Sequence, residues 1–167
     1  SLTPANVACA LKALEILQKH VDVTCLAEVT PQQFEQYKHL LPQKVRDRAE
    51  HVVYECLRVQ QAVEAMQKSD LAALGKILNA SHKSLKEKYE VTGAELDALA
   101  ENAQKLPYCL GSRMTGAGFG GCTISIVKKN MVKQFEDAVG SAYKNAIGYD
   151  ASFYQAEIAD GIIVEKL

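Results

Sequence analysis

The most informative segment of the chain is Leu110-Gly111-Ser112-Arg113-Met114-Thr115-Gly116-Ala117-Gly118-Phe119-Gly120-Gly121-Cys122, which runs into Thr123-Ile124-Ser125-Ile126-Val127. The alternation from Cys122 to Val127 predicts a strand with one buried face. The four glycines just before it permit positive φ angles and put no Cβ in the way of a neighbouring group. The segment therefore predicts a tight connection that opens a sheet.

This glycine loop has two physical interpretations. Its amides could converge on an anion or admit another backbone at close range, or it could be a plain turn between two strands. Gly116, Gly118 and Gly121 match the dinucleotide pattern G-x-G-x-x-G, but that pattern requires a helix after the last glycine, and a strand follows here. A Walker phosphate loop, G-x-x-x-x-G-K-[ST], is absent from the sequence.

The polar side chains beside the loop leave their roles open. Arg113 supplies a planar, permanently charged donor for a phosphate or carboxylate, and a salt bridge at a strand end is the alternative use. Ser112 and Thr115 offer hydroxyls, but no histidine or acid lies nearby in the sequence to activate them as nucleophiles. The sequence therefore gives no reason to predict that either hydroxyl is a nucleophile.

The chain before Pro107 has helical periodicity. Thr3-Pro4 and Thr30-Pro31 are start signals, and Pro42 opens the longest predicted helix. Its apolar stripe suits a coiled-coil seam or, as we favour, packing within one chain; the stripe consists of Val45, Ala49, Val52, Cys56, Val59, Val63 and Met66. Further helices are predicted from Ser69-Asp70 to Tyr89, and from a capping box of Thr92 and Glu95 to Leu106. The first helix carries Val7, Leu11, Leu14 and Leu17.

The chain after Pro107 mixes strands with one helix. Asn130 is a candidate cap for a helix that ends near Gly148. Phe153 to Ile158 and Ile162 to Val164, separated by Asp160-Gly161, predict a closing hairpin. The fold class is therefore α+β, a helical layer on an antiparallel sheet of about four strands. We predict one domain over residues 1–167, mainly helical in 1–106, with the glycine loop and sheet in 107–167.

Composition excludes several functional classes. With 19 basic and 20 acidic side chains and a formal charge of −1, no basic surplus points to nucleic acid. No apolar run is long enough to span a membrane, and the start lacks a signal peptide, which predicts a cytoplasmic protein or a piece of a longer one. The five cysteines form no Cys-x-x-Cys pair and the four histidines show no ligand spacing, so we expect reduced thiols and no metal site.

Several motifs together resemble one enzyme family. The segment from Gly111 to Cys122 closely resembles the third conserved motif of galactokinases, which belong to the GHMP small-molecule kinase superfamily. Further segments are similar to other elements of the same enzymes; they are Arg48-Ala49-Glu50-His51-Val52-Val53, Ser81-His82-Lys83-Ser84-Leu85, Tyr89-Glu90-Val91-Thr92, Glu95-Leu96-Asp97, Phe153-Tyr154 and Asp160-Gly161. The resemblance extends from about Val21 onward.

The resemblance implies a carboxy-terminal domain of ferredoxin-like kind. Family members are more than twice as long, and the catalytic aspartate, the serine-rich phosphate loop, the magnesium ligands and most sugar contacts lie in the amino-terminal half, which this chain lacks. ATP, Mg²⁺ and galactose would therefore meet in a cleft between this chain and the missing half, and this chain alone would be inactive. The residues implied to support the nucleotide site are Arg113, Thr115, Gly116, Ala117, Gly118, Phe119, Gly120 and Gly121.

Three other hypotheses remain at the level of sequence. The parent protein could be a galactokinase-like sensor that binds ATP and galactose and acts through a partner protein. It could phosphorylate a related sugar such as N-acetylgalactosamine. The chain could also be a free-standing domain in which the glycine segment is only a turn, although this leaves the match over residues 111–122 as coincidence.

Overall fold

The computed structural model describes residues 3–156 of the chain and shows six α-helices and two strands, with short 3₁₀ and π turns between them. In order they are α1 (Pro4–Leu17), η1 (Leu26–Glu28), α2 (Pro31–Tyr37), η2 (Lys38–Leu40), α3 (Gln43–Gln67), α4 (Leu71–Ser84), η3 (Leu85–Tyr89), α5 (Ala94–Gln104), β1 (Cys109–Thr115), β2 (Cys122–Val127), η4 (Lys129–Met131) and α6 (Val132–Ile147).

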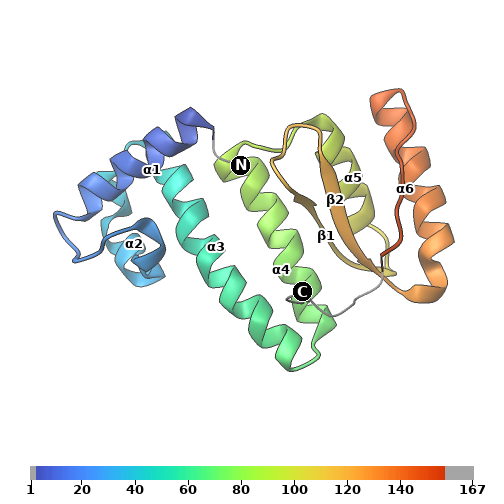
Figure 1. Ribbon diagram of the computed structural model, residues 1–167, viewed down its shortest axis with the longest axis horizontal. Coiled ribbons are helices and arrows are strands. Elements are labelled where there is room, and N and C mark those ends of the chain that lie inside the picture. Colours follow the sequence, from blue (N-terminus) through green and yellow to red (C-terminus); the bar gives the residue numbers. More distant parts are fainter. Residues whose placement is uncertain (1–2, 157–167) are drawn as a thin grey trace, which may run out of the picture.

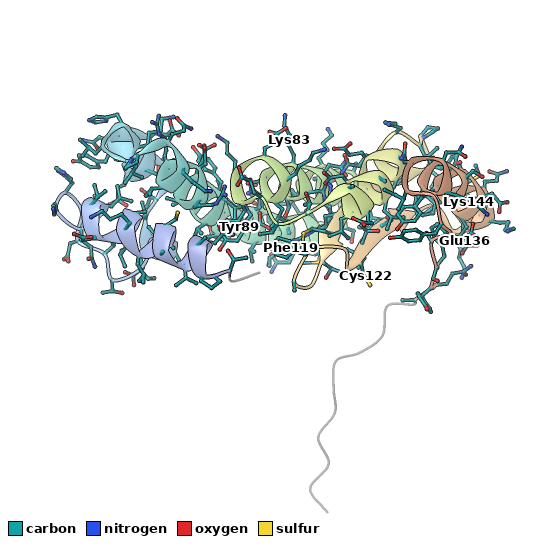
Figure 2. The ribbon with its side chains drawn as sticks, turned by 90° about the horizontal axis from the view of Figure 1, so that it is seen from above. Lys83, Tyr89, Phe119, Cys122, Glu136 and Lys144 are labelled. Atoms are coloured by element: carbon teal, nitrogen blue, oxygen red, sulfur yellow. The ribbon has the colours of Figure 1, made fainter. Side chains whose placement is uncertain are left out.

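The molecule is elongated, and its elements succeed one another along the long axis (Figure 1). Helices α1 and α2 pack on the first half of α3 at one end, and α5 with α6 forms the other end. The β1–β2 hairpin lies between α4 and α5. Seen from above, the helices α3 to α6 form a row, and the hairpin lies on one side of that row together with Phe119 (Figure 2).

Strand β1 is held along its free edge by side chains of α4. It pairs with β2 in an antiparallel register that includes Ser112 opposite Ser125. On its other edge the Ser112 amide donates to Asn79 Oδ1 at 2.8 Å, and the Met114 amide donates to His82 Nδ1 at 3.2 Å. An uncovered edge strand exposes such amides and invites wrong pairing, so α4 both satisfies and shields this edge.

Local signals explain where three of the helices begin. The Thr3 hydroxyl accepts from the Asn6 amide, Thr30 and Gln33 form a reciprocal capping box, and the Asp70 carboxylate accepts from the Ala73 amide. Each cap satisfies an amide that has no partner inside its helix. These helix starts and the long helix after Pro42 are confirmed.

The buried apolar residues fall into three clusters. The largest lies between α1, α2 and the first half of α3, around Leu17, Phe34 and Ala49. A second cluster lies directly beneath the glycine loop and joins Leu85, Tyr89, Val91, Leu96 and Met114. The third lies between α5 and α6 around Phe135 and Val139. Val52 packs against both of the first two clusters and so connects them.

Two parts of the predicted apolar stripes lie at the surface. Leu11 on α1 is 63% exposed, and Val59 and Met66 on α3 are 59% and 55% exposed. The second half of α3 contacts α4 on one side, and no described element covers the stripe itself. The prediction that the apolar stripe of α3 packs within the chain is therefore confirmed for the first half of the helix, and in the second half the stripe is exposed.

The described sheet has two strands, not the expected four. Phe153, Tyr154 and Gln155 have no strand structure; Phe153 instead packs its ring edge-on against Phe135, with centroids 6.4 Å apart. Alternation in the sequence suggested that this segment pairs with a strand, but Phe153 packs on α6 instead. Asp160-Gly161 and Ile162 to Val164 lie outside the described residues.

Two predicted helix caps are wrong. The residue before α5 is Gly93, at φ +121°, with no side-chain cap, and Thr92 is buried beneath the glycine loop. Helix α6 is preceded by a 3₁₀ turn, and Met131 instead of Asn130 occupies its N-cap position. The Thr92 carbonyl accepts a hydrogen bond from the Phe119 amide, and the Thr92 side chain forms no cap. The predicted stop at Gly148 is confirmed, with φ +98°.

The close approach of α4 to β1 depends on Gly75. A Cβ built on Gly75 would lie 1.9 Å from the Leu110 carbonyl oxygen, which is backbone and cannot rotate away. Gly75→Ala should therefore destabilise the protein by about 2 kcal/mol or more in urea unfolding, although alanine gains about 1 kcal/mol in helix propensity.

The matched control for this prediction is Gly140→Ala in α6. Its Cβ would lie 3.3 Å from the Phe153 ring, a side chain that shifts by a few tenths of an ångström. We expect a change within about 1 kcal/mol of wild type. Equal effects of the two substitutions would contradict the close packing of α4 on β1.

Candidate functional site

The glycine loop connects β1 to β2 through residues 116–121 in an unusual backbone conformation. Gly116, Gly118, Phe119 and Gly120 have φ angles of +78°, +86°, +58° and +98°. Glycine adopts such angles at little cost, but Phe119 carries a Cβ and is strained there. A non-glycine residue at positive φ persists only where its surroundings hold it.

The loop is held by the segment between η3 and α5. The Phe119 amide donates to the Val91 carbonyl at 3.0 Å and to the Thr92 carbonyl at 3.1 Å. Gly118 lies so close that a Cβ built on it would be 2.0 Å from the Val91 oxygen. The loop is therefore fixed on one side by backbone contacts that require glycine at position 118.

The other side of the loop is open. A Cβ built on Gly116 or Gly120 would meet nothing within 4 Å. The Phe119 side chain is 62% exposed, and Thr115, Ala117 and Gly121 are also exposed. The structure thus brings together seven of the eight predicted site residues, those from Thr115 to Gly121, on one edge of the molecule.

Arg113 points away from this edge. Its Nε donates to the Met114 carbonyl at 2.9 Å, and its Nη1 lies 3.4 Å from Glu55 Oε1 on α3. Glu55 also accepts from Ser81 Oγ at 2.5 Å and from Arg58 Nε at 2.7 Å. Burial would raise the pKa of the Glu55 carboxyl, but these donors outweigh it and leave the pKa below its usual value. Arg113 therefore serves an ion-pair network behind the loop.

Two buried histidines lie beneath the loop in neutral form. His82 accepts the Met114 amide on Nδ1, and its Nε2 faces Asp97 Oδ1 at 3.4 Å. His51 stacks on Tyr89 with centroids 4.4 Å apart, and its Nδ1 lies 2.9 Å from Ser84 Oγ. Burial lowers the pKa of both rings, that of His51 to about 4. His82 therefore supports the β1 backbone that leads into the loop, and His51 packs on the Tyr89 side chain.

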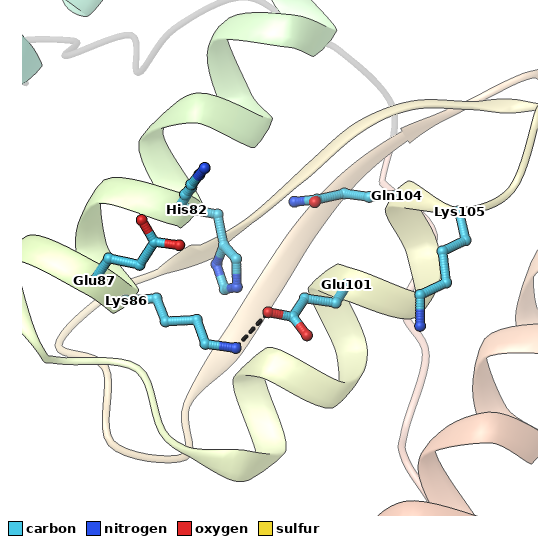
Figure 3. Close-up of a pocket in the computed structure, with 7 residues that line it drawn as sticks. His82, Lys86, Glu87, Glu101, Gln104 and Lys105 are labelled. Atoms are coloured by element: carbon cyan, nitrogen blue, oxygen red, sulfur yellow. Dashed lines mark hydrogen bonds and ion pairs between the residues drawn. The ribbon is translucent and has the colours of Figure 1, made fainter.

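A hollow of about 380 Å³ opens between α4 and α5 and has charged walls (Figure 3). Lys86 points across it to Glu101 and also lies 3.2 Å from Asp97, so these charges neutralise one another. A second hollow of about 300 Å³ adjoins the loop and is lined by Thr92, Gly93 and Phe119 among others. Neither is an enclosed ligand cavity.

The described residues provide no metal centre of their own. Within residues 3–156 no group of three His, Cys, Asp or Glu side chains is arranged to hold a metal ion. All five cysteines are free thiols. No helix in the same range is both long enough and apolar enough to cross a membrane.

Comparison with protein families gives a match to GHMP kinases C terminal over residues 62–145, half of the chain. The matched range contains α4, α5, the β hairpin, its glycine loop and most of α6. This chain belongs to the GHMP kinase C-terminal family.

Known relatives of this GHMP kinase domain are galactokinases. Over 151 residues it is 50% identical to those of Limosilactobacillus reuteri and Clostridium perfringens SM101, covering 90% and 89% of this chain and 38% and 39% of the relatives. It resembles the crystal structure of Lactococcus lactis galactokinase complexed with galactose, with a TM-score of 0.90 and 45% identity over 95% of this chain and 41% of that one. The chain thus spans about two fifths of the length of these relatives.

Sequence reasoning missed the groups that support the loop of this GHMP kinase domain. The Val91 and Thr92 carbonyls hold Phe119, and Glu55 holds Arg113. The resemblance singled out the segment that holds Val91 and Thr92, but backbone carbonyls leave no trace in residue identity, so the sequence did not reveal their role. For Glu55, its helical spacing from Arg58 was visible, but its pairing across 58 positions with Arg113 was not.

Substitutions at Gly118 and Gly120 distinguish the cost of backbone strain from the cost of a steric collision. Both have positive φ, so alanine at either position costs about 1–2 kcal/mol of backbone strain. Only Gly118→Ala adds a collision with the Val91 carbonyl, and it should destabilise the domain by about 2 kcal/mol more than Gly120→Ala in urea unfolding. Equal losses would contradict the close contact.

The buried neutral His51 predicts a pH dependence of stability. Its folded pKa of about 4 lies below the ordinary 6.5, so between these pH values the unfolded chain binds a proton that the folded chain does not. Stability should fall as pH falls, by about 1–2 kcal/mol from His51 between pH 7 and pH 5. His51→Gln should flatten this slope, measured by urea unfolding at each pH.

Val139→Ala, which removes a buried side chain that does not titrate, is the control for this prediction. It should leave the slope between pH 7 and pH 5 as in wild type. A slope that stays unchanged in His51→Gln as well would show that the His51 ring does not govern this dependence.

Proposed function

We propose that this chain is the carboxy-terminal domain of a galactokinase, whose complete form transfers the γ-phosphate of ATP to the anomeric hydroxyl of galactose. One observation carries the proposal, the 50% identity to galactokinases over nine tenths of the chain. The described loop geometry supports it, because a glycine edge fixed behind and open in front suits contact with a second phosphate-binding element.

In this proposal the domain supports a site that is built mainly elsewhere. ATP would contact the open edge of residues 115–121, with the backbone at Gly116 and Gly120 leaving room for a second loop. Arg113 would act indirectly, because it is paired with Glu55. Mg²⁺ would accompany the phosphates and balance their charge, and the resemblance implies that its protein ligands belong to the part of the kinase outside this chain.

Phosphoryl transfer depends on positioning and electrostatics more than on covalent chemistry by the protein. The chain's own contribution is therefore to hold its loop edge still and to exclude water from its side of the cleft. The Phe119 amide is already engaged by two carbonyls, so it fixes the loop and is not a free phosphate donor.

Further features of the proposal concern fold and location. We propose that the complete domain has a sheet of about four strands of ferredoxin-like kind, and that residues 1–167 form one domain. The five free thiols suit a reducing compartment such as the cytoplasm. The sensor and the kinase for another sugar are supported by no relative described above.

A chimera tests the proposed function directly. This chain would replace the matching carboxy-terminal part of the Lactococcus lactis galactokinase, and galactose-dependent ATP consumption would be measured with Mg-ATP. A supporting loop misplaced by about 1 Å costs about 100-fold, so we expect kcat/KM within about 100-fold of that enzyme. A folded chimera that binds both substrates and transfers no phosphate would overturn the proposal.

Two glycines provide a matched test of the open loop edge. Gly120 and Gly148 share φ +98° and empty surroundings, but only Gly120 lies in the loop. Gly120→Leu and Gly148→Leu should lose similar stability, about 1–2 kcal/mol each. In the chimera, Gly120→Leu should lower kcat at least about 10-fold, and Gly148→Leu should leave it within about twofold. Equal effects on kcat would refute the supporting role of the loop edge.

A further inference from the structure

A buried arginine lies behind the glycine loop and does not touch it. Arg48, on α3, is 3% exposed. Its Nε donates to Asn6 Oδ1 at 2.9 Å, its Nη1 to the Lys88 carbonyl, and its Nη2 to the Glu90 carboxylate. Asn6, also buried, donates in turn to the Tyr89 carbonyl at 3.2 Å. Two side chains from α1 and α3 thus hold one short segment.

That segment is the distorted end of α4. The helix continues as the π turn η3, and Glu90 then adopts a left-handed conformation at φ +55°. A π turn and a left-handed glutamate are both uncommon and carry strain. The carbonyls of Lys88 and Tyr89, at the end of the turn, receive their donors from Arg48 and Asn6. The pair therefore stabilises a conformation that the segment would not keep alone.

The next two residues are the ones that hold the loop. Val91 and Thr92 present their carbonyls to the Phe119 amide, and Gly118 packs against the Val91 oxygen. Glu90, which Arg48 also binds, has a left-handed backbone and directly precedes residues 91–92. A continuous series of contacts therefore runs from Arg48 through residues 88–92 to Gly118 and Phe119.

We propose that Arg48, assisted by Asn6, is a positioning residue that sets the conformation of the glycine loop. The guanidinium suits this task because it offers several donors in a fixed plane and stays charged. A buried charge is costly unless it is paired, and Arg48 is paired with acceptors on both the backbone and the side chain of one segment. Its effect on the site passes through backbone, with no contact to a substrate.

The first test uses the chain itself and does not depend on the proposed function. Arg48→Lys keeps the charge but loses the planar fork. Amide resonances of residues 116–121 should shift, and hydrogen exchange at the Phe119 amide should rise at least about 10-fold relative to the Val127 amide in β2. Loop resonances that stay at their wild-type positions would overturn the proposal.

The matched control is Val139→Ala, which removes a buried side chain from the separate cluster between α5 and α6. It lowers stability without touching residues 88–92, so the loop resonances should stay in place. If Arg48→Lys fails to fold, Asn6→Ala takes its place and should shift the same loop resonances. If Val139→Ala shifts the loop resonances as much as Arg48→Lys does, Arg48 only stabilises the fold and the proposal is refuted.

The second test rests on the proposed function and uses the chimera described above. Arg48→Lys should lower kcat/KM for ATP about 10- to 100-fold, while KM for galactose stays within about twofold. A KM for galactose that rises as much as the KM for ATP would contradict a role through the loop. Inactivity of the unsubstituted chimera would count against the proposed function only, because the resonance test on the chain still decides the role of Arg48.

Discussion

The contact between the glycine loop and residues 91–92 is the constraint on which the site depends. One amide, that of Phe119, is shared by two carbonyls, and Gly118 is in van der Waals contact with one of them. This contact needs a glycine at 118 and a strained residue at 119, so it fixes a backbone that would otherwise have many conformations. A loop fixed on one side and bare on the other is suited to meet a second surface.

The hairpin that carries the loop is stabilised from the side as much as by its own pairing. Two strands alone are marginally stable in water. Here α4 supplies Asn79 and His82 as acceptors for edge amides, and Gln104 of α5 donates to the Ser112 carbonyl at 2.8 Å. The absence of a Cβ at Gly75 lets α4 come close enough to do this. Helix packing therefore positions the strand, and the strand positions the loop.

Several polar side chains lie behind the loop, and they bind backbone groups or charged partners. Arg48 and Asn6 donate to carbonyls at the end of η3, and His82 accepts an amide of β1. The Glu55 carboxylate binds Ser81, Arg58 and Arg113. Burying such groups is unfavourable unless they are satisfied, but directional bonds define a conformation more narrowly than apolar contacts do. This arrangement fits a domain whose function is to hold one edge in place.

The sequence by itself determined the helix starts at Thr3, Thr30 and Asp70, the strand after Gly121 and the glycine-rich loop, because caps, alternation and glycine act over a few residues. Tertiary structure alone decided the rest. It paired Arg113 with Glu55, placed the Thr92 carbonyl against the Phe119 amide, and left Val59 and Met66 exposed. Each of these depends on groups distant in the chain. Arg113 and the Thr92 carbonyl find polar partners that only the folded chain brings near, whereas no described element packs against Val59 and Met66.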